Sequence, residues 1–196
     1  MLAALVFLLA TEGRPLHYWG AQTPVISVAH GVDGGEAAQL TDLHAAADRG
    51  ALVLRFSFDR AVRDAIQLPD GTPVSGRLSA TLYLDADDNR ATGIDQGPGD
   101  LRTGADFKLE LGVVSVGADP DEHRPAQALV TVALFRLARD GRRHALWRTD
   151  DAANPAAVSP HGEWVEVRVP PQHLAPARMR LILALGDGAR DGRFAP

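Results

Sequence analysis

The sequence predicts an all-β protein, an antiparallel β-sandwich of the jelly-roll or Ig-like kind with roughly eight to ten strands and little helix. Three observations favour this class. Short runs of alternating apolar and polar residues recur along the chain, Gly, Pro and Asp residues separate them, and no segment keeps a long helical period. The 196 residues are enough to bury the core of one domain.

The expected strands follow one another at short intervals. The clearest covers 51–59, where four large apolar residues occupy alternate positions. On one face of such a strand the apolar side chains meet the core, and on the other the polar ones meet water. The remaining expected strands are 25–29, 78–84, 106–116, 128–138, 143–149, 164–169 and 179–185.

Two segments leave a helical interpretation open. The alanine-rich segment 35–47 could hold one or two helical turns, although Thr41-Asp42-Leu43 before the break at Gly50 also suits a pair of strands. Residues 170–174 could form a single helical turn, because proline is tolerated at the first helical position. The segments expected to be surface loops are 119–125 and 150–160.

The N-terminus has the pattern of a secretion signal. Residues 2–10 are all apolar, too few to span a bilayer, and polar residues 11–13 follow them. This suits the apolar part of a signal peptide with the small residue Ala10 at the cut. We therefore expect residues 1–13 to be a signal peptide and 14–196 to be one secreted or periplasmic domain without a membrane span. Because no basic segment precedes the run, a strand or helix packed on the domain is the alternative.

Composition narrows the possible functions. The chain has 25 acidic and 20 basic residues, a formal charge of −5, which argues against nucleic acid as the main partner. It has no cysteine, so disulfides, thiolate metal sites and cysteine nucleophiles are excluded. Neither G-x-S-x-G nor H-E-x-x-H occurs, and no pair of carboxylates is fixed at the separation that a glycosidase needs. An enzyme is therefore the less favoured class.

The loop after the expected strand 78–84 carries the most specific motif. Asp85, Asp87 and Asn89 stand at alternate positions, and Asp88 and Asp95 lie close by. If the loop curls, their oxygens can turn toward one ion, and Ca²⁺ takes about six to eight oxygen ligands in flexible geometry. Mg²⁺ is the second choice, and metals that favour nitrogen or sulfur are disfavoured because no His or Cys accompanies the cluster.

The motif is not an EF-hand. That loop needs glycine at its sixth position and glutamate at its twelfth, where this chain has Arg90 and Gln96. Gly93 is instead expected to allow a tight turn after Thr92. From the residues alone, a solvated acidic turn that caps its own backbone is as good an interpretation as a metal site.

A second motif favours the metal site over the solvated turn, through a resemblance to known domains. The apolar strand end and acidic loop, Leu82-Tyr83-Leu84-Asp85-Ala86-Asp87, close with Thr92-Gly93, and Gly104-Ala105-Asp106-Phe107 follows. This order resembles that of carbohydrate-binding module family 9 and DOMON-like β-sandwich domains, over roughly residues 25–196. The resemblance implies a structural Ca²⁺ in this loop. The ligands that it implies are Asp85, Asp87, Asn89 and Asp106, with Asp88 and Asp95 as further candidates.

The resemblance also suggests a binding module, with carbohydrate as the ligand class. Trp164 shares a strand face with Glu166 and Arg168, so its ring is expected on the more polar side, and Trp147 is a second candidate contact. Tyr18 and Trp19 are further aromatic candidates. The commoner role of a strand tryptophan is core packing.

Three other functions stay open. One is a structural or accessory domain of the cell envelope without a small ligand. Another is a b-type haem domain, as in some relatives of this sandwich, for which Met179, Lys108 and the scattered histidines are the available ligands. The third is a hydrolase.

Overall fold

The chain forms two six-stranded β-sheets packed into a sandwich. The computed structural model describes residues 11–12, 15–28, 39–59, 78–94, 104–116, 127–148, 156–158, 163–185 and 188–196. Within these ranges every regular element is a strand and none is a helix. The all-β sandwich predicted from the sequence is confirmed.

The first sheet has the order β1-β9-β10-β4-β3-β2. All its neighbouring strands pair antiparallel except the short parallel pair β1–β9. Its strands are β1 (Thr11–Glu12), β2 (Ile26–Ser27), β3 (Leu40–Asp48), β4 (Ala51–Phe58), β9 (Ala156–Val158) and β10 (Trp164–Val169).

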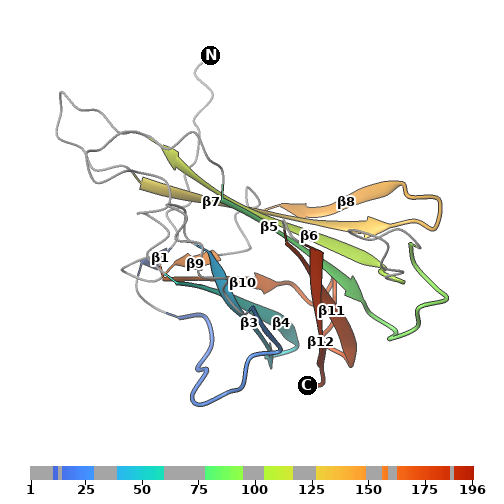
Figure 1. Ribbon diagram of the computed structural model, residues 1–196, viewed down its shortest axis with the longest axis horizontal. Coiled ribbons are helices and arrows are strands. Elements are labelled where there is room, and N and C mark those ends of the chain that lie inside the picture. The colour runs from blue at the N-terminus through green and yellow to red at the C-terminus, as the bar shows by residue number, and fades with distance from the viewer. Residues whose placement is uncertain are drawn as a thin grey trace.

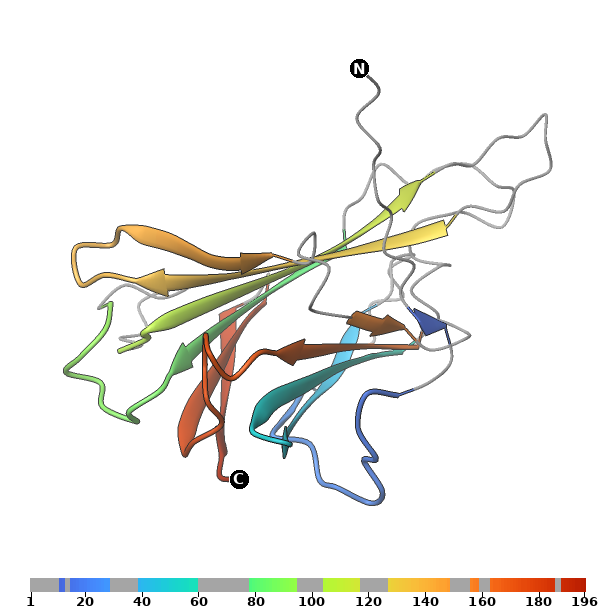
Figure 2. The same ribbon diagram turned by 180° about the vertical axis from the view of Figure 1, so that it is seen from behind.

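The second sheet is antiparallel throughout and has the order β12-β11-β5-β6-β7-β8. Its strands are β5 (Leu78–Asp85), β6 (Phe107–Val116), β7 (Gln127–Leu137), β8 (Arg143–Arg148), β11 (Met179–Leu185) and β12 (Gly188–Phe194). Figures 1 and 2 show the two sheets as separate layers, with β7 and β8 extending beyond the first sheet. The edge strands β12 and β2 come into contact along one side.

Alternating side chains of both sheets fill the space between the layers. In β4 the large residues that the sequence places at alternate positions point inward, and Phe56 has no exposed surface. From the opposite sheet, Leu82, Leu109 and Leu134 enter the same apolar cluster. Because burial of apolar area is the main favourable term in folding, this cluster holds the two layers together.

The predicted strands all occur, some with slightly different ends, and the structure adds others. The segment 35–47, for which a helical turn was one alternative, contains most of β3 in its described part, so the strand interpretation is correct there. The prediction of a loop over 150–160 is wrong at β9, and β12 was not predicted. Residues 170–174 form a turn in which the N–H groups of His173 and Leu174 donate to the carbonyl of Pro170.

Some predictions fall outside the described residues. Residues 1–10 and 13 of the expected signal peptide lie there, as do the expected loop 119–125 and Asp95. Thr11 and Glu12 pair with Ala157 and Val158 of β9. Within the described ranges no helix is long and apolar enough to cross a membrane.

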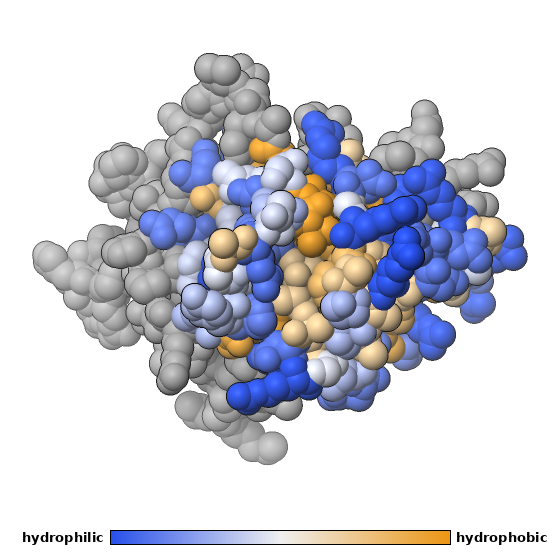
Figure 3. All heavy atoms as spheres, turned by 90° about the horizontal axis from the view of Figure 1, so that it is seen from below, coloured by the Kyte–Doolittle hydropathy of each residue, from blue (hydrophilic) through white to orange (hydrophobic). Residues whose placement is uncertain are grey.

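The surface seen from below mixes residue types. Figure 3 shows apolar side chains along the centre of this face and hydrophilic ones on both sides. Such a strip is ordinary for a folded protein, because apolar atoms contribute more than half of the accessible surface. By itself it marks no site.

Candidate metal centre

The acidic loop leaves the second sheet at the end of β5 and returns to it at the start of β6. An isolated bridge between Ile94 and Ala105 closes the base of the loop. Next to this bridge the N–H of Asp106 donates to the carbonyl of Leu84 at 2.9 Å. These contacts place Asp106 beside Asp85, although the two residues are far apart along the chain.

Two glycines make this close approach possible. Gly93 has φ +64°, and a Cβ there would lie 2.4 Å from the carbonyl oxygens of Gly104 and Ala105. Gly104 has φ +60°, and its Cβ would lie 2.5 Å from the Cα of Arg90. A side chain at either position would meet fixed backbone in a conformation that glycine alone adopts readily. The turn predicted at Gly93 is confirmed.

Three carboxylates converge at this point. One oxygen each of Asp85, Asp87 and Asp106 lies within 4.8 Å of the others. Asp85 is buried, Asp106 is half-buried and Asp87 is exposed, so the cluster extends from the protein interior to solvent. Like charges at such a separation repel, and a cation among them would remove the repulsion.

Backbone donors satisfy part of the cluster. Asp85 Oδ1 and Asp87 Oδ1 both accept from the N–H of Asn89 at 3.0 Å, and Asp106 Oδ2 accepts from the N–H of Ala86 at 2.9 Å. The Thr92 hydroxyl lies 2.9 Å from both carboxylate oxygens of Asp87. The loop therefore folds around the carboxylates and donates hydrogen bonds to them, so that water is not their only partner.

One oxygen of the cluster differs from the others in its hydrogen bonding. Asp85 has no exposed surface, and its Oδ2 is buried without a hydrogen-bond partner. Buried carboxylate oxygens in proteins are almost always paired with donors or metals, because an unpaired one loses its hydration without replacement. Oδ2 of Asp85 is thus an oxygen acceptor that the described side chains and backbone leave unused.

The protonation of the cluster reflects this crowding. Burial raises the pKa of Asp85 to about 6, and the nearby charges of Asp87 and Asp106 act in the same direction. Burial also raises the pKa of Asp106, against the donor at Ala86. At Asp87 desolvation acts upward, but donation from Thr92 and Asn89 outweighs it and the pKa lies below its usual value. Such perturbation is typical of functional carboxylates.

The other predicted ligands take different positions. Asp88, at φ +52°, faces two arginines, with 3.7 Å to Arg178 and 3.5 Å to Arg193. The Asn89 side chain is exposed, and its Oδ1 accepts from the N–H of Ala91 at 3.1 Å. Among the candidate carboxylates in the described ranges, the structure therefore brings Asp85, Asp87 and Asp106 together.

The arrangement suits a hard cation. Its donors are carboxylate oxygens, and the three-residue cluster includes neither histidine nor cysteine. Carboxylates are ligands of Ca²⁺ and Mg²⁺, and a partly exposed site leaves room for water or backbone oxygens to complete the coordination. The cluster can hold a metal ion, and its chemistry matches the class that the sequence predicts.

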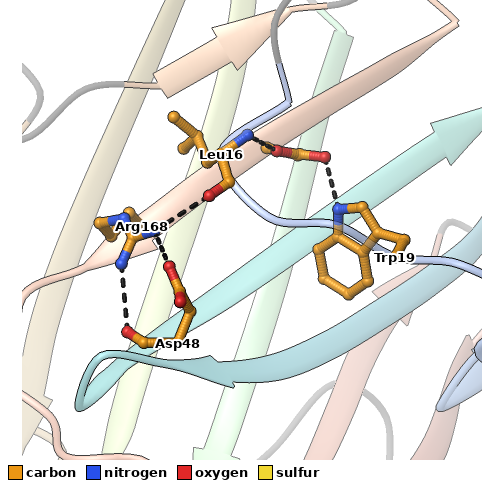
Figure 4. A network of polar contacts seen from close by, with 5 residues as sticks. Leu16, Trp19, Asp48 and Arg168 are labelled. Carbon is orange, nitrogen blue, oxygen red and sulfur yellow. Dashed lines mark hydrogen bonds and ion pairs between the residues drawn. The ribbon is translucent and has the colours of Figure 1, made fainter.

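A second polar centre, which the sequence did not predict, lies on the outer face of the first sheet. Glu166 has no exposed surface and accepts from the N–H of Leu16 and the indole N–H of Trp19 (Figure 4). It also accepts from Arg55, at 2.8 Å from Nε and 2.7 Å from a terminal nitrogen. Glu166 thereby holds residues 15–22, which we call the strap, against the sheet.

A neighbouring ion pair holds the same segment. The Arg168 guanidinium donates to the carbonyl of Leu16 at 3.0 Å and to the carboxylate of Asp48 (Figure 4). Beneath the strap, Trp19 and Leu16 pack on Ala46 and Val53. The only local signal is that Glu166 and Arg168 alternate with valines in β10. Their contacts with the strap span about 150 positions and could not be read from the sequence.

The two candidate aromatic contacts differ in position. Trp147 is 2% exposed and belongs to the core between the sheets, so it presents no ring face to a ligand. Trp164 is half-buried on the outer face of the first sheet, with the Arg55 guanidinium 4.5 Å from its ring centre. The outward placement expected for Trp164 is thus found.

The residues named for haem ligation are engaged in other contacts. Met179 has no exposed surface and lies in the apolar core. Lys108 forms an ion pair with Glu110 at 2.7 Å.

Comparisons with protein-family models, curated proteins and solved structures find no match for this chain.

Proposed function

We propose that this chain is a secreted or periplasmic β-sandwich binding module that Ca²⁺ stabilises and whose ligand is a carbohydrate. The metal would be held by Asp85, Asp87 and Asp106, and its role would be to pin the loop between β5 and β6. The observation that carries the metal part is the buried Oδ2 of Asp85, which has no partner at the point where three carboxylates meet.

Calcium fits the site better than the alternatives. It accepts irregular arrangements of carboxylate, carbonyl and water oxygens, whereas Mg²⁺ demands near-octahedral geometry and holds its waters. A divalent cation would balance the negative charge of Asp85 in the interior. It would also favour the ionised form of all three carboxylates. The site lies at the end of the core strands, so its loss would loosen the β5–β6 connection.

Thermal unfolding tests the metal proposal. At 100 times its Kd, Ca²⁺ stabilises a folded protein by about 2.7 kcal/mol, which for a domain of this size raises Tm by roughly 5–10 °C. We expect this rise on adding Ca²⁺ to chelator-treated protein, a smaller rise with Mg²⁺, and none in Asp85→Ala.

The matched control is Asp140→Ala. Asp140 is exposed in the turn between β7 and β8, where it pairs with Arg142. Its substitution should leave the calcium effect intact. Melting curves that are the same with calcium and with chelator would show that the acidic loop is only a solvated turn.

The carbohydrate part depends on the resemblance and on the half-buried Trp164. A sugar site usually needs an aromatic ring next to groups that form hydrogen bonds, and the outer face of the first sheet provides both. Retention of the protein on affinity gels that contain polysaccharide would support this part. Absence of retention together with a calcium effect would favour a structural domain without a small ligand.

A further inference from the structure

The β7–β8 hairpin is a basic segment in a chain that is acidic overall. Residues 136–148 contain five arginines and one acidic residue, whereas the whole chain has a formal charge of −5. All five arginine side chains are exposed. Figures 1 and 2 show the hairpin reaching beyond the first sheet, with β8 as its outer strand. An acidic protein thus carries local positive charge at one margin of its second sheet.

A β-bulge brings two of these arginines to the same face. In a regular strand Arg143 and Arg148 would point to opposite faces, because they are five positions apart. The pairing register shifts within the hairpin, so that Arg143 stands opposite Leu137 and Arg148 stands opposite Ala133. Both partners in β7 lie on the face turned away from the core residue Leu134. Because residues opposite each other share a face, both arginines lie on the outer face of the second sheet.

The acidic side chains nearby balance only part of this charge. Oε1 of Glu110 lies 2.7 Å from Lys108 and 3.3 Å from Arg143, so one carboxylate contacts two cations. Among the residues that the structure describes, none forms an ion pair with Arg148. The Arg143 guanidinium also lies 5.2 Å from the ring centre of Phe135, which keeps it over the sheet. A guanidinium has five N–H donors, so both arginines can bind further carboxylates.

β8 is also an edge strand. It is last in the order of the second sheet, and in the described part of the chain no strand pairs with its other side. Alternate residues of an edge strand turn their N–H and C=O groups away from the sheet. The six residues Arg143–Arg148 are long enough to pair with an extended segment. A partner that fits this edge therefore has both a hydrogen-bonding backbone and negative charge.

We propose that the β8 edge binds an acidic, extended segment of another protein, which joins the second sheet as a further strand with its carboxylates beside Arg143 and Arg148. In such strand addition the backbone supplies affinity and alternate side chains supply specificity. Arginine suits the recognition of carboxylates, because its planar guanidinium binds them through two parallel hydrogen bonds. This partner is additional to the carbohydrate proposed above and does not depend on it.

The same charges disfavour a second copy of this chain as the partner. Antiparallel pairing of two β8 edges would bring Arg143 of one copy toward Arg148 of the other, and like charges that face each other destabilise a ladder. Charged edges protect sheets from self-association in this way. A charge on either face would protect the edge, so protection does not explain the bulge that turns Arg148 to the face of Arg143. Bulges commonly re-aim side chains at functional positions.

Fluorescence anisotropy with a labelled peptide of alternating glutamate and threonine tests the proposal. We expect binding at low salt that is lost at about 0.5 M NaCl, where charges are screened beyond about 4 Å. The double variant Arg143→Gln/Arg148→Gln should bind about tenfold more weakly, because it removes two exposed ion pairs. The matched control is Arg49→Gln/Arg190→Gln, which removes two exposed arginines elsewhere and should bind as the wild type does.

A second peptide separates strand pairing from charge attraction. Alternating glutamate and proline keeps the charge but removes every second N–H, so this peptide cannot continue the ladder and should bind more weakly. Equal affinity for the two peptides, equal affinity in the two double variants, or no binding of the first peptide would overturn the proposal. A wild-type protein that binds dextran sulfate or phosphatidylglycerol vesicles but not the first peptide would also overturn it.

Discussion

Asp85 is the side chain of the acidic loop whose ionisation costs the most free energy. Its carboxylate has no exposed surface, one of its oxygens lacks a partner, and two other carboxylates lie within 4.8 Å. Without a cation, each of these features disfavours the ionised form. With a cation, the same features make a strong ligand, because the charge is already desolvated and in place.

Asp85→Asn should therefore act in opposite directions with and without calcium. In chelator, the substitution removes one charge from a crowded, partly buried site, so we expect a Tm equal to or above that of the wild type. In calcium, the variant should gain little, so the wild type should be the more stable of the two. Melting both proteins under both conditions tests this crossover, and a variant that is less stable by the same amount in both would refute it.

Single residues of the site were predictable to different degrees. Asp85 and Asp87 are recognisable from their spacing, because alternate positions after a strand can turn toward one point. Asp106 is brought to them by the bridge between Ile94 and Ala105, and only the resemblance pointed to it. Asp88 has a positive φ and faces Arg178 and Arg193, and this could not be read from spacing.

Among the larger elements, the strap is the one whose attachment is most unusual. It crosses the outer face of the first sheet and is held by Glu166 and Arg168 rather than by strand pairing. Removing Glu166 would leave Arg55 without its carboxylate and would free the N–H groups of Leu16 and Trp19. Breaking a buried, hydrogen-bonded pair in this way costs about 3–5 kcal/mol.

Glu166→Ala should lower the free energy of unfolding in urea by an amount in this range. The exposed pair Asp140–Arg142 provides the comparison, because a solvent-exposed pair contributes about 0–1 kcal/mol. We therefore expect Asp140→Ala to change stability far less. Equal effects of the two substitutions would mean that the strap is held mainly by apolar packing of Leu16 and Trp19.

The strands were predictable where alternation is strong. β4 and β5 place apolar residues at every second position, and the sequence predicts both with nearly their observed ends. β3 was ambiguous because alanine suits helix and small-residue packing alike, and tertiary pairing with β4 decided it. β12 has glycine and charged residues in place of an apolar face, so its pairing with β11 was not visible in the sequence.

For the molecule as a whole, the sequence predicted the class of architecture but not its connections. Strand order depends on contacts between distant segments, such as β5 beside β11 and β4 beside β10. No local pattern encodes these neighbours. The partition of the strands into two sheets emerges only from the folded chain.

The pH dependence of overall stability tests the burial of His44, whose ring lies 5.7 Å from that of Trp19 in the strap. Burial lowers the pKa of His44 below 6.5, with Arg55 acting in the same direction and Asp42 and the backbone of Gln22 opposing. Between its folded pKa and 6.5 the unfolded chain binds more protons at His44, so this group lowers stability as the pH falls through that window.

His44→Gln should therefore make stability less sensitive to acid between pH 7.5 and 5.5, when both proteins are measured in calcium by urea unfolding. His144→Gln, in an exposed residue of β8, is the control and should follow the wild type. If the two variants showed the same pH dependence, burial would not be lowering the pKa of His44.

We propose that the loop between β5 and β6 binds one calcium ion. Isothermal titration calorimetry of chelator-treated protein tests it most directly, with Asp87→Ala as the comparison, because Asp87 is exposed and its loss should not prevent folding. We predict one Ca²⁺ per chain in the wild type and at least tenfold weaker binding in the variant. The absence of binding in the wild type, or equal binding in both proteins, would contradict the claim.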